Sequence, residues 1–165
     1  MDEFSVGIIT VSDKGSKGER ADASGPVIEE IIKSIGGRIE KYVIIPDENQ
    51  DIKEAIIDMS DNLGLNLILT TGGTGFSKRD ITPEATLGVI ERLVPGIPEA
   101  MRARSLQITP KAMLSRAQAG IRKESLVVNL PGSPKSVREN LEAIIPALKH
   151  GIEILTGQAS ECGEK

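Results

Sequence analysis

The stretch 65-LNLILTTGGTG-75 decides the fold. Leu65–Thr71 is a short apolar run, typical of a strand that is buried on both faces, and it passes directly into a glycine-rich turn. Comparable runs predict three more strands at Val6–Val11, Ile39–Ile45 and Leu126–Leu130. Each of these runs is followed by polar or glycine-containing sequence.

Helical patterns separate the strands. Apolar spacing and capping residues predict helices from near Pro26 to Ile35, over Ile52–Leu63, from Thr82, within Pro95–Gln107, at Ala112–Gln118 and from Pro134 to about Leu155. Thr82-Pro83-Glu84 has the composition of a helix start, with Thr82 as the N-cap. Strand and helix alternate, so we expect an α/β fold in which helices cover both faces of a mostly parallel sheet.

Length and composition exclude several classes of protein. The chain has 165 residues and a net charge of −4, which fits one domain over residues 1–156 followed by a polar tail over 157–165. Few aromatic residues and no excess of basic ones argue against a nucleic-acid partner. The single cysteine, Cys162, excludes an intramolecular disulfide. With no apolar run long enough to span a membrane and no signal peptide, we expect a cytoplasmic protein without a membrane partner.

Four polar or glycine-rich segments follow directly after the predicted strands. They are Ser12–Gly25, Pro46–Asp51, Thr71–Asp80 and Asn129–Lys135. Because the carboxyl ends of parallel strands lie at the same edge of a sheet, these segments should meet there. The sequence therefore predicts a binding site at this edge.

The glycine segment Thr71–Gly75 is a candidate phosphate-binding loop. Glycines allow backbone amides to approach a phosphate without interference from a Cβ atom. The segment lacks the Gly-Lys-Ser/Thr ending of a P-loop and the spacing of a dinucleotide fingerprint. A tight turn without a ligand remains the alternative.

Two carboxylates and one helix start extend this candidate site. Asp80 and Asp47 are expected beside the glycine loop, where they could hold Mg²⁺ together with a polyphosphate. The alternatives are a loop hydrogen bond for Asp80 and a solvated turn for Asp47. Ser133 is the predicted N-cap of the last helix, and with Lys135 nearby that helix start could also bind an anion.

In order along the chain, these segments resemble the molybdopterin adenylyltransferase family, the MogA/MoaB type that also forms the G domain of gephyrin-like proteins. The matching segments are Thr10–Asp13, Pro46-Asp47, Leu69–Phe76, Arg79–Thr86, Pro98–Arg102, Ala112–Arg116 and Asn129–Lys135. Together they span nearly the whole chain. The resemblance implies a three-layer α/β/α domain, a homotrimer, and adenylation of molybdopterin by MgATP with release of pyrophosphate.

The resemblance also implies roles for individual residues. Asp47 and Asp80 would be the catalytic carboxylates and would bind Mg²⁺ or its waters. The residues expected to hold ATP are Gly72, Gly73, Thr74, Gly75, Ser12 and Asp13. Those expected to hold molybdopterin or phosphate are Asn129, Pro131, Gly132 and Ser133. The adenylated pterin would then pass to a downstream metal-insertion protein, a possible partner.

Two other functions remain open on the sequence alone. A protein of the same fold could hold molybdopterin without adenylating it, although the intact pair Asp47 and Asp80 argues against this. A nucleotide hydrolase could use the same glycine loop, although the relatives of that kind carry extra domains for which this chain has no room.

Overall fold

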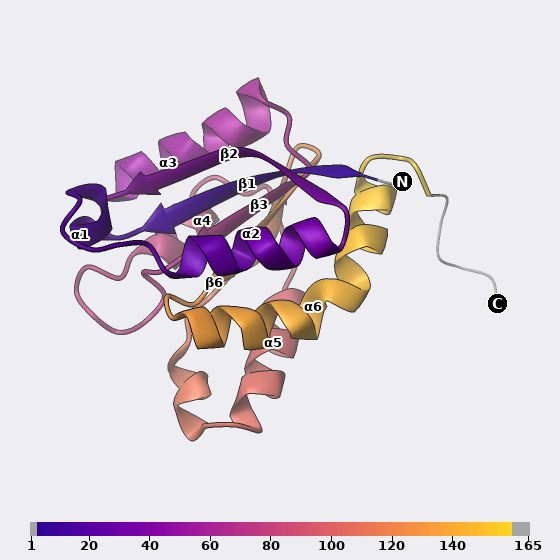
Figure 1. Cartoon of the computed structure of the whole chain (residues 1–165). Coiled ribbons are helices and arrows are strands. Elements are labelled where there is room, and N and C mark those ends of the chain that lie inside the picture. The colour runs from indigo at the N-terminus through magenta and orange to yellow at the C-terminus, as the bar shows by residue number, and fades with distance from the viewer. Residues whose placement is uncertain (1–2, 160–165) are drawn as a thin grey trace.

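The computed structural model describes residues 3–159, and the strands of this part of the chain form one sheet (Figure 1). Residues 160–165, which include Cys162 and most of the predicted tail, lie outside the described residues. The strand order is β2-β1-β3-β6-β5-β4. Their bounds are β1 Phe4–Val11, β2 Gly37–Ile45, β3 Leu67–Thr71, β4 Arg92–Leu93, β5 Ala119–Arg122 and β6 Ser125–Leu130.

Helices connect and cover these strands. Their bounds are α1 Asp13–Ser16, α2 Ser24–Ser34, α3 Asn49–Ile57, α4 Thr82–Leu87, α5 Gly96–Leu106 and α6 Pro134–Leu155. A π-helical turn, η1, continues α3 over Asp58–Asn62, and a 3₁₀ helix, η2, spans Pro110–Leu114. In residues 3–159, the helices are all too short or too polar to cross a membrane.

The predicted mostly parallel sheet is confirmed. Strands β1, β2, β3 and β6 run parallel to one another, and their last residues are aligned: Val11 pairs with Ile45, Thr10 with Thr71, and Thr71 with Leu130. The four segments that follow these strands therefore leave the sheet at one edge.

Two apolar cores lie on opposite faces of the sheet, which makes three layers. One core joins β1, β3 and β6 to α2, α5 and α6, with Ile28, Met101 and Leu141 among its buried side chains. The other joins the opposite face to α3 and α4 through Ile52 and Ala85. Alternate residues of the central strands point into different cores, so the strands are apolar throughout.

The far edge of the sheet differs from the expectation. β4 and β5 were not predicted, and they run antiparallel to their neighbours. Both are short, β4 is exposed, and β5 (Ala-Gly-Ile-Arg) has no alternating pattern. The helix expected at Ala112–Gln118 is also wrong, because the helical turn is η2, whose start is fixed by Thr109 accepting a hydrogen bond from the Lys111 amide.

Two local predictions near the site need correction. The polar segment Ser12–Gly25, for which no helix was predicted before Pro26, contains α1 from Asp13 and the start of α2 at Ser24. Thr82 is not the N-cap of α4: Ile81 occupies that position, and Thr82 is the first helical residue. The predicted cap of α6 is confirmed, since Ser133 Oγ accepts a hydrogen bond from the Ser136 amide at 3.2 Å.

Candidate active site

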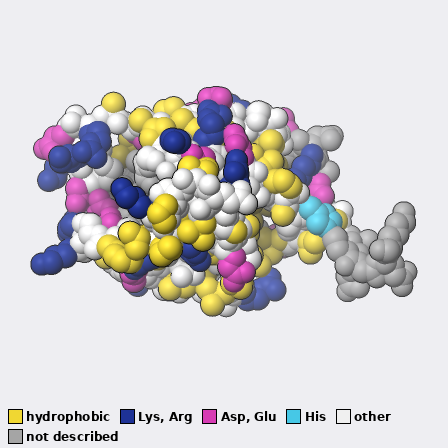
Figure 2. Space-filling model, turned by 90° about the horizontal axis from the view of Figure 1, so that it is seen from below, with side chains coloured by type: hydrophobic (Ala, Val, Ile, Leu, Met, Phe, Trp, Pro, Cys, Tyr) yellow, Lys and Arg dark blue, Asp and Glu magenta, His cyan; other side chains and the backbone are white. Residues whose placement is uncertain are grey.

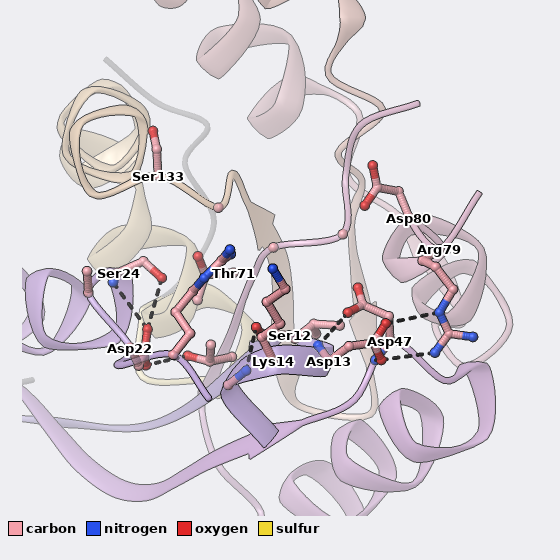
Figure 3. A pocket seen from close by; sticks show the side chains of 18 of the residues that line it. Ser12, Asp13, Lys14, Asp22, Ser24, Asp47, Thr71, Arg79, Asp80 and Ser133 are labelled. Carbon is pink, nitrogen blue, oxygen red and sulfur yellow. Dashed lines mark hydrogen bonds and ion pairs between the residues drawn. The ribbon is translucent and has the colours of Figure 1, made fainter. Parts of the chain in front are cut away.

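A cavity of about 650 Å³ opens where the parallel strands end (Figure 3). All four segments predicted to meet there contribute to its lining. Of the sequence-predicted site residues, the cavity brings together Ser12, Asp13, Asp47, Gly72, Gly73, Asp80, Gly132 and Ser133. Its volume falls in the range of small-molecule sites, about 300–1,000 Å³.

The glycine turn forms the floor of the cavity in backbone conformations that only glycine adopts freely. Gly72 has φ +97° and Gly73 has φ +70°. A Cβ atom on Gly72 would collide with the Val11 carbonyl, and one on Gly73 would collide with Thr82 Oγ1. Thr71 Oγ1 donates a 2.6 Å hydrogen bond to the Pro131 carbonyl, which ties the turn to the segment before α6. The turn is therefore anchored to the chain before α6, and its two glycines carry no side chain.

Asp47 is held in place by two hydrogen bonds with Asp13. The Asp13 amide donates to Asp47 Oδ2 at 2.9 Å, and the Asp47 amide donates to Asp13 Oδ1 at 3.0 Å. Arg79 completes the arrangement, because its guanidinium donates to both oxygens of Asp13, at 2.9 and 3.0 Å, and to Glu48 at 2.7 Å. Asp13 thus links the end of β1 to the loop that carries Asp80.

The two acidic residues of this pair have opposite pKa shifts. Hydrogen bonds from Arg79 lower the pKa of Asp13, which keeps its carboxylate charged. Burial raises the pKa of Asp47, and the negative charges of Asp13 and Asp80 raise it further. The negative charges around Asp47 are therefore only partly neutralised, and a bound cation would be stabilised there.

Asp47 and Asp80 have the donor atoms that Mg²⁺ uses. Among the residues that the structure describes, no hydrogen-bond donor reaches Asp47 Oδ1, and Asp80 accepts one bond, from the Ser77 amide to Oδ2 at 2.9 Å. No cluster of three or more His, Cys, Asp or Glu residues able to hold a metal occurs in residues 3–159. Two carboxylates fit Mg²⁺ when substrate phosphates and waters supply its other ligands, but they would not retain a resident metal alone.

Besides Arg79, three charged lining residues were missed as candidates by the sequence reasoning. Asp22 accepts hydrogen bonds from Thr10 Oγ1 at 2.8 Å and from the Ser24 and Gly25 amides at 3.2 and 3.1 Å, which fixes the start of α2 beside the cavity. Lys14 and Arg20 line the same cavity, and neither forms an ion pair within the described part of the chain. The available signal was their place in the segment after β1.

A second cavity, of about 260 Å³, lies on the other side of the glycine turn. It is lined by Thr74, Gly75 and Pro131 together with residues of α5, η2 and α6. Thr74, Gly75 and Pro131 are therefore near the first cavity but face the second. Arg116 fixes this side of the turn, since Nε donates to the Gly75 carbonyl at 2.8 Å and Nη2 to the Asp80 carbonyl at 2.6 Å.

Asn129 lies outside the lining of both cavities. It is completely buried in β6, where its Nδ2 donates to Thr70 Oγ1 at 3.0 Å and to Thr86 Oγ1 at 2.9 Å. Its Oδ1 accepts from the Gln118 amide at 3.1 Å. These bonds use both amide hydrogens and the oxygen of the buried side chain, so Asn129 joins β3, α4 and β6 rather than facing a ligand. Lys135 is also outside both linings and lies 4.0 Å from Glu139 on α6.

Comparison with known proteins places this geometry in a family. Residues 7–150 match the family described as "Probable molybdopterin binding domain". The chain is 43% identical over 167 residues to a protein of Helicobacter pylori named molybdopterin adenylyltransferase, covering 100% of this chain and 95% of that protein. It is 41% identical over 158 residues to the Escherichia coli protein of the same name, covering 92% and 81% of the two chains.

A solved structure has the same fold. It is the molybdopterin biosynthesis enzyme MoaB of Thermus thermophilus, which matches with a TM-score of 0.89 and 49% identity. The match covers 93% of this chain and 97% of that one. The similarity therefore extends over the whole domain and includes the strand ends that form the cavity.

Proposed function

Because this chain belongs to the family of probable molybdopterin binding domains, we propose that it is a molybdopterin adenylyltransferase of molybdenum cofactor biosynthesis, using ATP and releasing pyrophosphate. The observation that carries this proposal is the cavity that Asp47, Asp80 and the Gly72–Gly73 turn line together. A purely structural loop would not need two carboxylates, two exposed cations and a side-chain-free floor in one cavity.

The reaction is a nucleotidyl transfer. An oxygen of the terminal phosphate of molybdopterin attacks the α-phosphorus of ATP, the new phosphoanhydride bond forms, and the bond to the β-phosphate breaks to release pyrophosphate. The attacking phosphate is already ionised, so no general base is needed. Positioning and charge neutralisation are then the main tasks of the protein.

Asp47 and Asp80 would hold Mg²⁺ or its bound waters, since both line the cavity and both retain an unoccupied carboxylate oxygen. When bound, this ion neutralises phosphate charge during the transfer. Asp13 would act through Asp47 and Arg79, because its carboxylate oxygens are occupied by hydrogen bonds from these two residues. We assign it to positioning rather than to direct contact with ATP.

Lys14 and Arg20 would neutralise the polyphosphate from the side of the cavity formed after β1. Gly72 and Gly73 line the cavity, and their backbone would lie against the triphosphate. Ser12 borders the same space, although its hydroxyl already accepts the Gly15 amide at 3.0 Å. Thr74 and Gly75, which face the second cavity, would contribute to ATP binding by holding the shape of the turn.

Molybdopterin would bind along Pro131–Ser133. Pro131 borders the second cavity, and Gly132 and Ser133 border the first, so this segment lies between the two spaces. A pterin there would present its phosphate toward the nucleotide. Asn129, which was expected to contact the pterin, would support this segment from inside the fold.

We further propose that the protein forms a homotrimer, works in the cytoplasm and delivers its product to a metal-insertion protein. The trimer is supported by large apolar side chains exposed on and near α5 and η2, namely Leu106, Ile108, Met113 and Leu114. Figure 2 shows apolar side chains gathered on the side of the molecule seen from below. Size-exclusion chromatography with light scattering gives the mass of the assembly, and a monomeric mass would contradict the trimer.

Incubation with purified molybdopterin and MgATP tests the proposed function. We expect equal amounts of pyrophosphate and adenylyl-molybdopterin, with no ATP consumed when molybdopterin is omitted. A protein that bound molybdopterin without releasing pyrophosphate would instead be a binding module, and ATP consumption without the pterin would indicate a nucleotide hydrolase.

A further inference from the structure

Thr82, the first residue of α4, has a buried hydroxyl group with no hydrogen-bond partner. The residue is 0% exposed, and its Oγ1 is the one buried side-chain polar atom within residues 3–159 that lacks a partner. Buried polar groups in folded proteins nearly always have partners, because an unsatisfied one destabilises the fold. Thr86, one turn later and equally buried, shows the usual situation, since it accepts a bond from Asn129.

The Thr82 hydroxyl lies beneath the floor of the larger cavity. The Thr82 amide donates to the Gly73 carbonyl at 3.1 Å, which fixes the residue under the glycine turn. The point that a Cβ atom on Gly73 would occupy overlaps Thr82 Oγ1, and the same point lies 3.3 Å from Asp47 Oδ1. The absence of a side chain at Gly73 therefore leaves the hydroxyl and the carboxylate oxygen on either side of one small space.

The two atoms have complementary hydrogen-bonding capacity. Thr82 Oγ1 carries a proton to donate, and Asp47 Oδ1 receives no donor within the described part of the chain. The other oxygen, Oδ2, is already held by the Asp13 amide. A second donor at Oδ1 would fix both oxygens of the carboxylate and hence its rotation.

Packing alone does not explain a threonine here. Valine has nearly the same shape, contains no polar group and would fill the same buried position without an unsatisfied hydroxyl. The unsatisfied hydroxyl therefore destabilises the free protein. We expect it to form a hydrogen bond in the state of the site that contains a ligand.

Resting on the proposed function, we propose that Thr82 is a positioning residue whose hydroxyl donates a hydrogen bond to Asp47 Oδ1 when MgATP occupies the cavity. The bond holds the carboxylate in one orientation toward the nucleotide, and because a carboxylate oxygen has two lone pairs, Oδ1 can accept it and still face the metal. Thr82 touches neither substrate nor metal in this role. It acts through Asp47, as the Asp13 amide does from the other side.

The test combines turnover with the stability of the free protein in Thr82→Val. We expect a melting temperature equal to or above that of the wild type, a kcat for adenylation at least about tenfold lower, and a KM for ATP within about threefold. Thr82→Ser, which keeps the hydroxyl, should restore kcat to within about threefold of the wild type.

Thr86→Val is the matched control for a purely structural hydroxyl. It leaves Asn129 short of a partner, so its melting temperature should fall while that of Thr82→Val does not. A kcat of Thr82→Val equal to that of the wild type would overturn the proposal. A kcat of Thr82→Ser that is no higher than that of Thr82→Val would also overturn it. If the valine variant does not fold, Thr82→Ser is compared with Thr82→Ala, and equal kcat values in these two would overturn it.

The proposed function and the role of Thr82 can be disproved separately. A wild-type protein that releases no pyrophosphate from molybdopterin and MgATP would remove the proposed function, and the role of Thr82 with it. A fully active wild type with a fully active Thr82→Val variant would remove the role of Thr82 alone.

Discussion

Among the carboxylates of residues 3–159, Asp47 is the one whose pKa is clearly raised. Burial and the charges of Asp13 and Asp80 raise its pKa, and the hydrogen bond from the Asp13 amide offsets this only in part. Such an arrangement lowers the stability of the empty protein and raises its affinity for a cation. Sites that bind ligands often retain this kind of unfavourable contact.

Replacing Asp47 by asparagine should stabilise the free protein at neutral pH. The raised pKa means that the folded state binds the proton more tightly than the unfolded chain, whose carboxyl has its ordinary pKa of 3.8. The free energy of unfolding of the wild type therefore falls as the pH rises from the ordinary pKa through the raised one. Asp47→Asn has no charge at this position, so its stability does not fall for this reason. Melting temperatures of both proteins measured between about pH 3 and 7 should differ at the upper end and converge at the lower.

The same variant should lose adenylation activity, because an amide does not supply the negative charge that a cation requires. A lower melting temperature than the wild type at neutral pH would contradict the electrostatic description of Asp47.

Asp80→Asn should affect the chemical step more than the binding of the pterin. We expect molybdopterin affinity to stay near that of the wild type and adenylation to fall by at least about tenfold. Glu142→Gln is the control, since Glu142 is exposed on α6 and outside both cavities. Fluorescence titration with molybdopterin and pyrophosphate release measure the two quantities. Full turnover by Asp80→Asn in the presence of Mg²⁺ would reject its assignment.

At the scale of elements, the turn after β3 is the part of the site most sensitive to a single methyl group. Gly73 has φ +70°, and a side chain there would displace Thr82, the first residue of α4. The turn, the start of α4 and Asp47 are therefore coupled through one position.

Gly73→Ala should lower both stability and MgATP affinity. The left-handed conformation alone costs an alanine about 1–2 kcal/mol, and the collision with Thr82 Oγ1 adds to that cost. Gly96→Ala at the start of α5 is the control, because a Cβ atom there meets nothing within 4 Å. Thermal melts with and without MgATP measure both effects. Equal melting temperatures for the wild type and Gly73→Ala would show that the turn is not constrained as described.

The elements that could be predicted from the sequence are those with a clear local pattern. The strand runs and the long apolar stripe of α6 gave their positions to within a few residues. β4 and β5 could not be predicted, because Arg92–Leu93 is two exposed residues and Ala119–Arg122 pairs through contacts distant in sequence. Thr82 matched the pattern of an N-cap, but the chain before it turns so that its hydroxyl faces Gly73 instead.

At the scale of the whole molecule, parallel strand topology accounts for the site. The order β2-β1-β3-β6 brings the ends of four strands to one edge, and this convergence followed from the alternation of strands and helices. Sequence alone did not show that Thr74 and Gly75 face a second cavity, nor that Asn129 points inward. These depend on the direction in which a turn leaves the sheet and on which residue of a doubly buried strand meets α4.

Apart from Arg79, the charged lining residues that sequence reasoning missed come from α1 and from the chain between α1 and α2. Arg20 and Asp22 carry no motif. Asp22 is fixed at the cavity by the hydrogen bond that it accepts from Thr10 Oγ1, near the end of β1 (Figure 3). Their position depends on the path of an irregular segment through the folded protein, which no local sequence pattern predicts.

A crystal structure with Mg²⁺ and a non-hydrolysable ATP analogue would show whether the cavity is the nucleotide site. We expect the triphosphate against Gly72 and Gly73, with the metal between it and the carboxylates of Asp47 and Asp80. A nucleotide bound away from the cavity, or a metal that contacts neither carboxylate directly nor through water, would contradict this expectation.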